Sequence, residues 1–250
     1  MNKDNIKKLA AAFQDKPAGE VLHYFLSLYK ATASAAAEKE KDRIALASSL
    51  GAEDQVLTDM VLSIHPGARV FVLDTGRIHA ETYDLIDLTM KHYGMRYEIF
   101  FPEATEVERM VNLYGPNLFY ESVENRKKCC FFRKVKPLQR ALSTLGVWIT
   151  GLRKEQAVTR GAIEKIEWDE TNGLIKLNPL ADWSEEQVWE YIKRNDIPYN
   201  RLHDRGYPSI GCAPCTRAVK PGEDIRAGRW WWENPEQKEC GLHNRKTREV

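Results

Sequence analysis

Four cysteines occur in two pairs that could bind one metal centre. Cys129 and Cys130 are adjacent in the segment RKKCCFFRK, and Cys212 and Cys215 have C-x-x-C spacing in the segment GCAPC. The C-x-x-C spacing lets two thiolates reach one metal from a single turn. The two segments together can therefore supply a four-sulfur site for zinc or for an iron–sulfur cluster.

Residue spacing alone leaves three interpretations of these pairs open. Zinc is the metal more commonly bound by a C-x-x-C motif together with a second cysteine pair. In such zinc sites, however, residues usually also separate the two cysteines of the second pair. An iron–sulfur cubane offers separate iron corners, so the neighbouring thiolates of Cys129 and Cys130 could each bind one iron. The third interpretation is that these cysteines are buried free thiols.

The fifth cysteine, Cys240, lies apart from the pairs in the segment KECGLH. If the other four thiols bind a metal, Cys240 is free to react, and cationic neighbours favour its nucleophilic thiolate form. Those neighbours in the sequence are Lys238, His243, Arg245 and Lys246. The competing interpretation is an incidental surface cysteine.

The composition narrows the class of protein. The chain has 250 residues, of which 43% are hydrophobic and 29% charged, as is ordinary for one large globular domain. No stretch approaches the roughly 20 apolar residues of a membrane span, and the first residues lack a secretory signal pattern, so we expect no membrane partner. Lys plus Arg total 37 and Asp plus Glu total 36, which gives no overall charge to attract nucleic acid. An odd number of cysteines argues against secreted disulfides and predicts a cytoplasmic location.

The elements that must position these cysteines alternate between strands and helices. Short apolar runs predict strands, and apolar residues at helical spacing predict the helices that follow them. The predicted strands cover residues 43–48, 68–75, 95–101 and 147–151, and the predicted helices cover residues 53–64, 80–93 and 184–195. This alternation predicts an α/β fold, a parallel twisted sheet flanked by helices. We expect residues 1–217 to form this domain and residues 218–250 to form a flexible tail.

Two segments that follow predicted strands could bind a nucleotide. SSLGAED, residues 48–54, places small residues where the backbone can approach a phosphate, and LDTG, residues 73–76, ends the second strand at the edge where such sheets bind ligands. Neither is a Walker loop. Glu53 and Asp54 would repel phosphate, so we assign them to the helix dipole. The candidate nucleotide-site residues are Ser48, Ser49, Gly51, Asp74, Thr75 and Gly76.

Cationic side chains for an anionic ligand occur in three places. The candidates are Lys134, Arg153, Arg160, Arg226 and Arg229. The lysine lies four residues after Cys130, so on an α-helix the two side chains share one face. Two arginines follow the fourth predicted strand, and two precede three consecutive tryptophans. Arginine suits phosphate and sulfate oxygens; next to aromatic residues it also suits single-stranded nucleic acid, for which the near-neutral charge is unfavourable.

In combination, these segments resemble the assimilatory adenylyl-sulfate reductases, the iron–sulfur-containing branch of the phosphoadenosine phosphosulfate (PAPS) reductase family. The likeness runs from about residue 40 to residue 242, nearly the whole chain. The matching segments are SSLGAEDQVL, LDTGRIHAETY, KKCCFFRKVKPL, TGLRKEQAVTR, IGCAPCTR and GRWWWE followed by KECGLH. Their order and combination are highly specific, whereas any one of them alone is weak.

The resemblance implies a fold and roles for the cysteines. The implied fold is adenine-nucleotide alpha-hydrolase-like, with a modified PP-loop. The implied cofactor is a 4Fe–4S cluster on Cys129, Cys130, Cys212 and Cys215, with Lys134 between the cluster and the substrate. Cys240, in the tail, is the implied catalytic nucleophile.

The resemblance also implies the reaction and its partner. Adenosine 5′-phosphosulfate (APS) would be reduced to sulfite and AMP through an S-sulfocysteine on Cys240, in assimilatory sulfate reduction for cysteine biosynthesis. No uncommitted cysteine is left in the chain to release the sulfite, so an external dithiol, thioredoxin, is the implied reductant. The family suggests a homo-oligomer.

Three alternatives stay open from the residues. PAPS is the rival substrate of the same chemistry, because a single sequence does not tell how the 3′ position is surveyed. A second alternative is a PP-loop enzyme that thiolates tRNA, although such an enzyme would need a basic surface. The third is a non-enzymatic redox sensor based on zinc or a cluster, with a reactive tail cysteine.

Overall fold

The computed structural model describes residues 3–29, 43–156 and 161–234. The chain divides into two compact units that alternate along the sequence. The first unit is formed by the described residues within Met1–Val72, Thr82–Glu98 and Leu142–Asn200. The second is formed by those within Leu73–Glu81, Ile99–Ala141 and Arg201–Val250.

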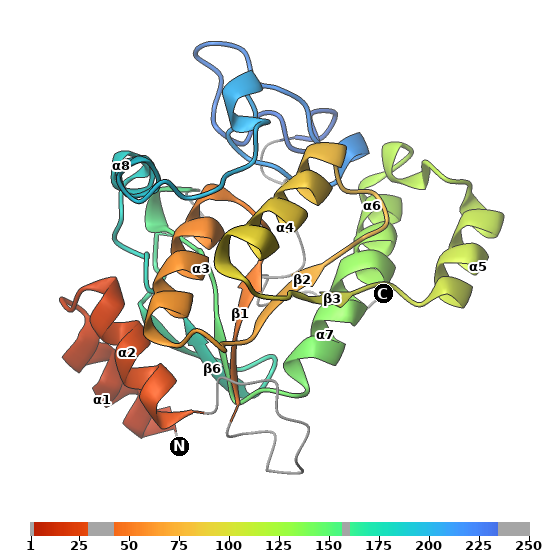
Figure 1. Ribbon diagram of the computed structural model, residues 1–250. Helices are drawn as coiled ribbons and strands as arrows, with labels where there is room; N and C mark the ends of the chain where they lie inside the picture. The colour runs from red at the N-terminus through yellow and green to blue at the C-terminus, as the bar shows by residue number, and fades with distance from the viewer. Residues whose placement is uncertain (1–2, 30–42, 157–160, 235–250) are drawn as a thin grey trace. The chain divides into compact units, whose positions relative to one another are not determined.

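Six strands form one mostly parallel sheet in the order β3-β2-β1-β4-β6-β5 (Figure 1). Strand β1 pairs in parallel with β2 and β4, and β4 pairs in parallel with β6, whereas β5 is antiparallel to β6. The strands are Ile44–Ser48 (β1), Val70–Leu73 (β2), Glu98–Phe100 (β3), Val147–Ile149 (β4), Ile166–Asp169 (β5) and Leu174–Leu177 (β6). The predicted parallel sheet is confirmed for its central strands, and its antiparallel edge was not predicted.

The central strands are short and almost entirely apolar. All three residues of β4 and all four of β6 are buried, and Ile44 and Leu46 of β1 are fully buried. Strands that are covered on both faces read as continuous hydrophobic runs instead of alternating patterns. The sequence IALAS is such a run, and it could therefore be recognised as a strand that precedes a helix in the sequence.

Five helices lie wholly or mostly in the first unit. They are Lys3–Phe13 (α1), Ala18–Leu28 (α2), Ala52–Ile64 (α3), Ala80–Tyr93 (α4) and Glu185–Arg194 (α8). Helix α3 contacts β1, α2 and α8 (Figure 1). The predicted capping box at the start of α8 is present, since Ser184 and Gln187 bond to each other's backbone N–H groups. The predicted helices 53–64, 80–93 and 184–195 are confirmed, and their observed ends differ from the predicted ones by no more than one residue.

The second unit contains most of the helical region before β4. Its helices are Ala104–Tyr114 (α5), Val123–Cys130 (α6) and Lys136–Leu142 (α7). A π-helical turn, Phe131–Val135, joins α6 to α7 directly. A π-turn widens the backbone spiral and shifts which side chains share a face, and such turns are frequent at functional sites.

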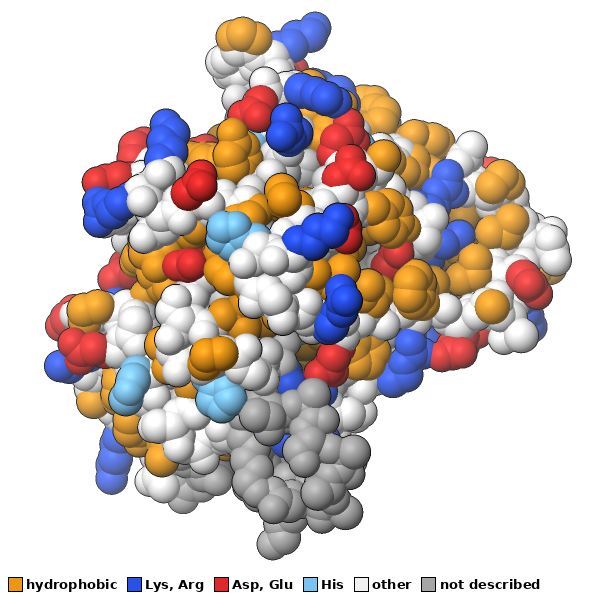
Figure 2. Space-filling model, in the orientation of Figure 1, with side chains coloured by type: hydrophobic (Ala, Val, Ile, Leu, Met, Phe, Trp, Pro, Cys, Tyr) orange, Lys and Arg blue, Asp and Glu red, His pale blue; other side chains and the backbone are white. Residues whose placement is uncertain are grey.

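Among the described helices, none is both long and apolar enough to cross a bilayer. On the face drawn in Figure 2, Lys and Arg side chains are interspersed with Asp and Glu side chains. A tRNA-thiolating enzyme would need a concentrated basic surface, and the face in view does not present one among the described residues.

Candidate functional site

The predicted phosphate loop, which follows β1, folds around an internal acceptor. The backbone N–H and the hydroxyl of Ser49 both donate to Asp54 Oδ2, at 2.7 and 2.6 Å. The Ser48 hydroxyl accepts the N–H of Leu50, whose φ of 63° lies in the left-handed region. Gly51 then caps the N-terminus of α3. These bonds set the conformation of the loop from within.

Asp54 does more than the predicted role at the helix dipole. Its side chain lies in the first turn of α3, as predicted, but it is only 6% exposed. Burial raises its pKa from 3.8 to about 6, although hydrogen bonds from Ser49 and from the Gly151 backbone act in the opposite direction. A Cβ added to Gly151 would overlap the Asp54 carboxylate, so this glycine permits the close approach. Asp54 thus joins the loop after β1 to the loop after β4.

The raised pKa of Asp54 predicts a pH dependence of stability. Because the folded chain binds this proton more tightly than the unfolded chain does, the contribution of Asp54 is greatest below pH 4 and is lost as the pH rises to about 6. The unfolding free energy should fall by about 3 kcal/mol over this window. Denaturant unfolding of wild type and Asp54→Asn at several pH values measures the difference. An equal slope in both proteins contradicts the prediction, and Asp87→Asn, at an exposed residue, is the control.

Arg153, in the first unit, forms an ion pair with Glu53 in the first turn of α3. Its guanidinium Nε donates to Glu53 Oε1 at 2.8 Å, and Nη1 donates to the Trp183 carbonyl at 3.3 Å. The residue is 3% exposed. Both acidic residues of SSLGAED therefore have structural partners, and Arg153, which was predicted to bind substrate, is held by one of them.

The LDTG segment lies in the second unit, and one of its residues contacts a cysteine. The Asp74 carboxylate accepts the Gly76 N–H at 2.7 Å, and Gly76 has a φ of 69°. The Thr75 hydroxyl lies 3.3 Å from Cys212 Sγ. The Thr75 carbonyl accepts a 2.7 Å hydrogen bond from Arg133 Nη1. The predicted nucleotide residues of this segment are thereby linked to one of the cysteine pairs.

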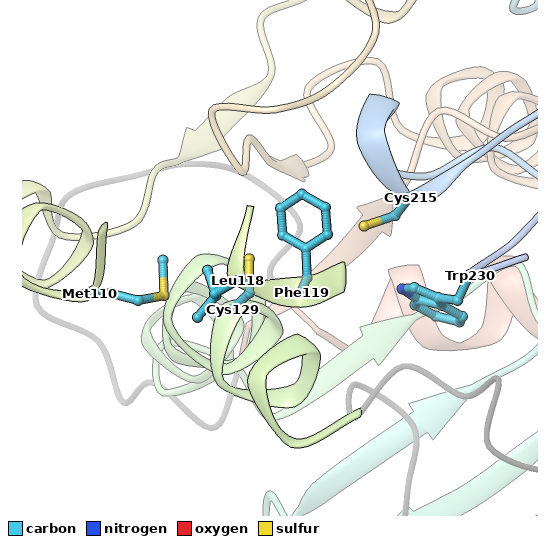
Figure 3. Packing of buried hydrophobic residues seen from close by; sticks show 6 residues of the cluster. All are labelled: Met110, Leu118, Phe119, Cys129, Cys215 and Trp230. Carbon is cyan, nitrogen blue, oxygen red and sulfur yellow. The ribbon is translucent and has the colours of Figure 1, made fainter. Parts of the chain in front are cut away.

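The structure brings cysteines of both pairs into one apolar cluster. We call Cys129, Cys130, Cys212 and Cys215 the thiol site. Cys129 and Cys215 are buried in a cluster with Met110, Leu118, Phe119 and Trp230 (Figure 3), and Cys212 packs against it. Cys129 and Cys130 end α6, while Cys212 and Cys215 bracket a short 3₁₀ turn, Ala213–Cys215. None of the four forms a disulfide.

Burial and mutual repulsion disfavour bare thiolates at this site. The pKa of Cys215 is raised to about 12, chiefly by burial and then by the neighbouring Cys212 and Cys129, whereas Lys134 and Arg229 act to lower it. Burial likewise raises the pKa of Cys129, opposed chiefly by Arg133, which also donates a hydrogen bond to its sulfur. Negative charge here therefore requires compensating positive charge. Within the described ranges, no three His, Cys, Asp or Glu side chains are grouped as ligands of a single metal ion.

Lys134 lies in a type of helix that was not predicted. The expectation that Lys134 shares a face with Cys130 assumed an α-helix, whereas the residue lies in the π-helical turn, so the shared face stays a prediction. The charge of Lys134 acts to lower the pKa of Cys215. Sequence patterns do not reveal a π-turn, because its residue preferences overlap with those of the α-helix.

The predicted arginines near the tryptophans lie in the second unit. Arg229 is buried and donates from Nη1 to Ser209 Oγ and to the Ile210 carbonyl, at 3.3 and 3.2 Å. A Cβ on Gly211 would overlap its guanidinium. Arg226 is half-buried, and its N–H donates to Asp224. Two other predicted residues, Cys240 and Arg160, lie outside the described residues.

Three charged residues of the second unit were not predicted. Arg133 bonds to Cys129 and to the Thr75 carbonyl, while Arg126 and Glu233 form a buried ion pair. Helical spacing could have indicated both arginines, because Arg126 precedes Cys129 by three residues and Arg133 follows it by four. No sequence pattern links Glu233 to them.

Residues 218–234, part of the predicted tail, belong to the second unit together with residues 201–217. The Arg217 N–H donates to the Gly228 carbonyl, and the Val219 N–H donates to the Gly206 carbonyl. The predicted boundary after residue 217 and the flexibility of the tail stay predictions.

Known proteins resemble this chain over most of its length. The family model described as the phosphoadenosine phosphosulfate reductase domain matches residues 43–218. An adenosine 5′-phosphosulfate reductase of Allochromatium vinosum is 55% identical over 83% of this chain and 81% of its own. A protein of the same name from Burkholderia cepacia is 56% identical over 81% of each chain.

Solved structures resemble the fold. A phosphoadenylyl-sulfate (PAPS) reductase from Candida auris, in a phosphate complex, aligns with a TM-score of 0.72 and 28% identity, covering 88% of this chain and 98% of its own. Yeast FAD synthetase in complex with FAD aligns with a TM-score of 0.53 and 13% identity, covering 86% of this chain and 75% of its own. The second likeness concerns the fold alone, whereas the first, together with the family model, agrees with the predicted fold.

Proposed function

Because the chain belongs to the phosphoadenosine phosphosulfate reductase family, we propose that it reduces APS to sulfite and AMP in sulfate assimilation. The observation that carries this proposal is the similarity to relatives named adenosine 5′-phosphosulfate reductase, at half or more of all aligned positions. The thiol site supports it, because Cys129, Cys212 and Cys215, which come from two segments far apart in the sequence, meet at one apolar cluster.

The thiol site fits a 4Fe–4S cluster by the chemistry of its donors. It offers four cysteines without disulfides, and its core is apolar. Because burial disfavours bare thiolates here, a cationic partner such as iron is needed to hold them deprotonated. We assign Cys129, Cys130, Cys212 and Cys215 as the ligands. When bound, such a cluster would supply a fixed local charge, and Lys134 and Arg229, whose positive charges act on Cys215, would partly balance it.

We assign three sets of residues as substrate-binding groups in this proposal. The loop after β1 contributes Ser48, Ser49 and Gly51, and the LDTG segment contributes Asp74, Thr75 and Gly76. Positive charge for the phosphate and sulfate oxygens comes from five side chains: Lys134, Arg153, Arg160, Arg226 and Arg229. Arg153 and Asp54 act partly through the loop itself, since their side chains already have partners there.

Three successive thiol attacks complete the proposed mechanism. The Cys240 thiolate attacks the sulfur of APS, the bond between sulfur and the phosphate oxygen breaks, AMP leaves with the bond electrons, and S-sulfocysteine forms. A thioredoxin thiolate then attacks the Cys240 sulfur and releases sulfite. The second thioredoxin thiol attacks this mixed disulfide, which frees Cys240 and leaves thioredoxin oxidised. The two electrons come from thioredoxin.

PAPS is the second candidate substrate. The family model and the Candida auris structure both carry the name of the PAPS enzyme. The relatives with higher identity carry the APS name, which favours APS.

Sulfite production from APS and from PAPS, each with reduced thioredoxin, tests the proposal. We expect sulfite from APS, less from PAPS, and none when thioredoxin is omitted, in which case AMP release should stop at one equivalent of enzyme. Iron and zinc content of the same sample separates the cluster from a zinc site. Sulfite from PAPS alone would assign the second substrate, and no sulfite from either nucleotide would refute the proposal. A homo-oligomer and a cytoplasmic location stay predictions, the first of which light scattering checks.

A further inference from the structure

A buried tryptophan contacts two arginines beside the thiol site. Trp230 is 1% exposed and belongs to the apolar cluster of Cys129 and Cys215 (Figure 3). The guanidinium carbons of Arg126 and Arg229 each lie 4.7 Å from the centre of its rings. Cation–π contacts of this kind strengthen when they are desolvated. The indole is therefore fixed in place by two charged groups as well as by apolar packing.

One of these arginines also forms a buried, bidentate ion pair. Arg126 Nε and Nη2 donate to the two carboxylate oxygens of Glu233, at 2.9 and 2.8 Å. The two side chains are 1% and 2% exposed. Two parallel bonds to a carboxylate fix orientation as well as distance. Since loss of either partner would leave the other charge buried and unpaired, this pair strongly resists opening.

Backbone contacts hold the intervening residues as well. We call residues 228–233 the cover segment. The Trp230 N–H donates to the Cys215 carbonyl at 3.1 Å, and the Glu233 N–H donates to the Trp230 carbonyl at 2.8 Å. Trp230 has a φ of 42°, a conformation rare for a tryptophan. The side-chain contacts of Trp230 and Glu233 compensate for that backbone strain.

The cover segment connects two parts of the proposed chemistry. Arg126 is on α6, three residues before Cys129, so the ion pair joins the cover segment to the helix that ends in two cysteines. The segment itself carries Arg229. Cys240 follows Glu233 by seven residues, which span at most about 25 Å when fully extended. The position of Glu233 therefore limits the region that Cys240 can reach.

We propose that Arg126 and Glu233 are positioning residues that lock the cover segment over the thiol site. The locked segment excludes solvent from Cys129 and Cys215, and it fixes the point from which the chain extends to Cys240. The second role rests on the proposed function, whereas the first concerns only the thiol site and its metal.

Glu233→Gln in the full-length, iron-loaded protein tests the lock. We expect iron release to a coloured chelator to be more than tenfold faster, because the buried arginine loses its countercharge and the cover segment opens more often. In single turnover with APS, formation of S-sulfocysteine should slow by at least about threefold, because the chain that leads to Cys240 no longer starts from a fixed position. The reaction of isolated S-sulfo enzyme with thioredoxin should change by less than twofold, since that step occurs at Cys240 alone.

Two further variants keep the test decisive. Glu124→Gln breaks the Lys128–Glu124 pair, which is more exposed and lies on the same helix, and it should match wild type in every measurement. Glu233→Asp keeps the charge but shortens the side chain, so its iron release should be intermediate, and it replaces Glu233→Gln if that variant does not fold. Iron release at the wild-type rate in Glu233→Asp and Glu233→Gln would overturn the lock. Wild-type protein that forms no S-sulfocysteine would refute the proposed function instead, and the iron-release result would still stand.

Discussion

Cys240→Ser is expected to lower sulfite release from APS by at least about 1,000-fold while leaving the iron content unchanged. Serine has nearly the same size, but its hydroxyl is almost fully protonated at neutral pH and is a far weaker nucleophile toward sulfur. The four cysteines of the thiol site are separate from residue 240, so the brown colour should persist. Sulfite is measured with thioredoxin in excess, and iron is measured on the same sample.

Mass spectrometry of the intermediate gives an independent check of this prediction. Wild-type protein mixed with APS alone should gain one SO₃ group on the peptide that contains Cys240, and Cys240→Ser should gain none. Loss of iron in the variant would make Cys240 a metal ligand. An SO₃ group on another cysteine would reassign the nucleophile.

Cys215→Ser should remove both the cluster and the activity. Cys215 is buried in the apolar cluster with Cys129 and Trp230, so the variant replaces a soft thiolate donor with a hydroxyl in apolar surroundings. Soft thiolate ligands are those that iron–sulfur clusters select. A buried hydroxyl without a partner also costs about 1–3 kcal/mol of stability. We expect purified protein that is colourless, contains little iron, releases sulfite at below about 1% of the wild-type rate, and unfolds at lower temperature.

Cys240→Ser is the matched control for this variant, because both make the same replacement of sulfur by oxygen. Cys240→Ser should keep its iron and lose activity, whereas Cys215→Ser should lose both iron and activity. Full iron content and normal absorption in Cys215→Ser would exclude this residue as a ligand. Unchanged iron with lost activity would indicate that Cys215 acts on the substrate instead.

Local patterns were sufficient to predict the first four strands and three of the helices. Helices α3, α4 and α8 follow from apolar residues at helical spacing, and Ser184 with Gln187 marked the start of α8. The central strands follow from apolar runs, because both of their faces are buried. Strands β5 and β6 were missed. The segment IEWD of β5 is half-exposed and mixed in character, and its antiparallel pairing with β6 depends on a turn, residues 170–173, that joins them.

The roles of charged residues were harder to predict, because they depend on partners far away in the sequence. Asp54 was assigned to the helix dipole, but its bonds to Ser49 and its contact with Gly151 show only in the folded chain. Arg153 was predicted to meet an anion, and its nearest carboxylate belongs to Glu53, 100 residues earlier. Charge pattern identifies residues able to bind an anion, but burial decides which of them already have a protein partner.

Residue types and short spacings thus established the candidate chemistry: four thiols in two pairs, one cysteine apart from them, and arginines after strands and before tryptophans. These features are local, so they can be read from the chain. Tertiary structure decided which pieces meet. It placed Cys129 beside Cys215, inserted a π-turn at Lys134, and paired Arg126 with Glu233 across 107 residues. Such contacts depend on the packing of a whole unit, since burial gives a distant ion pair its strength and no local pattern encodes that burial.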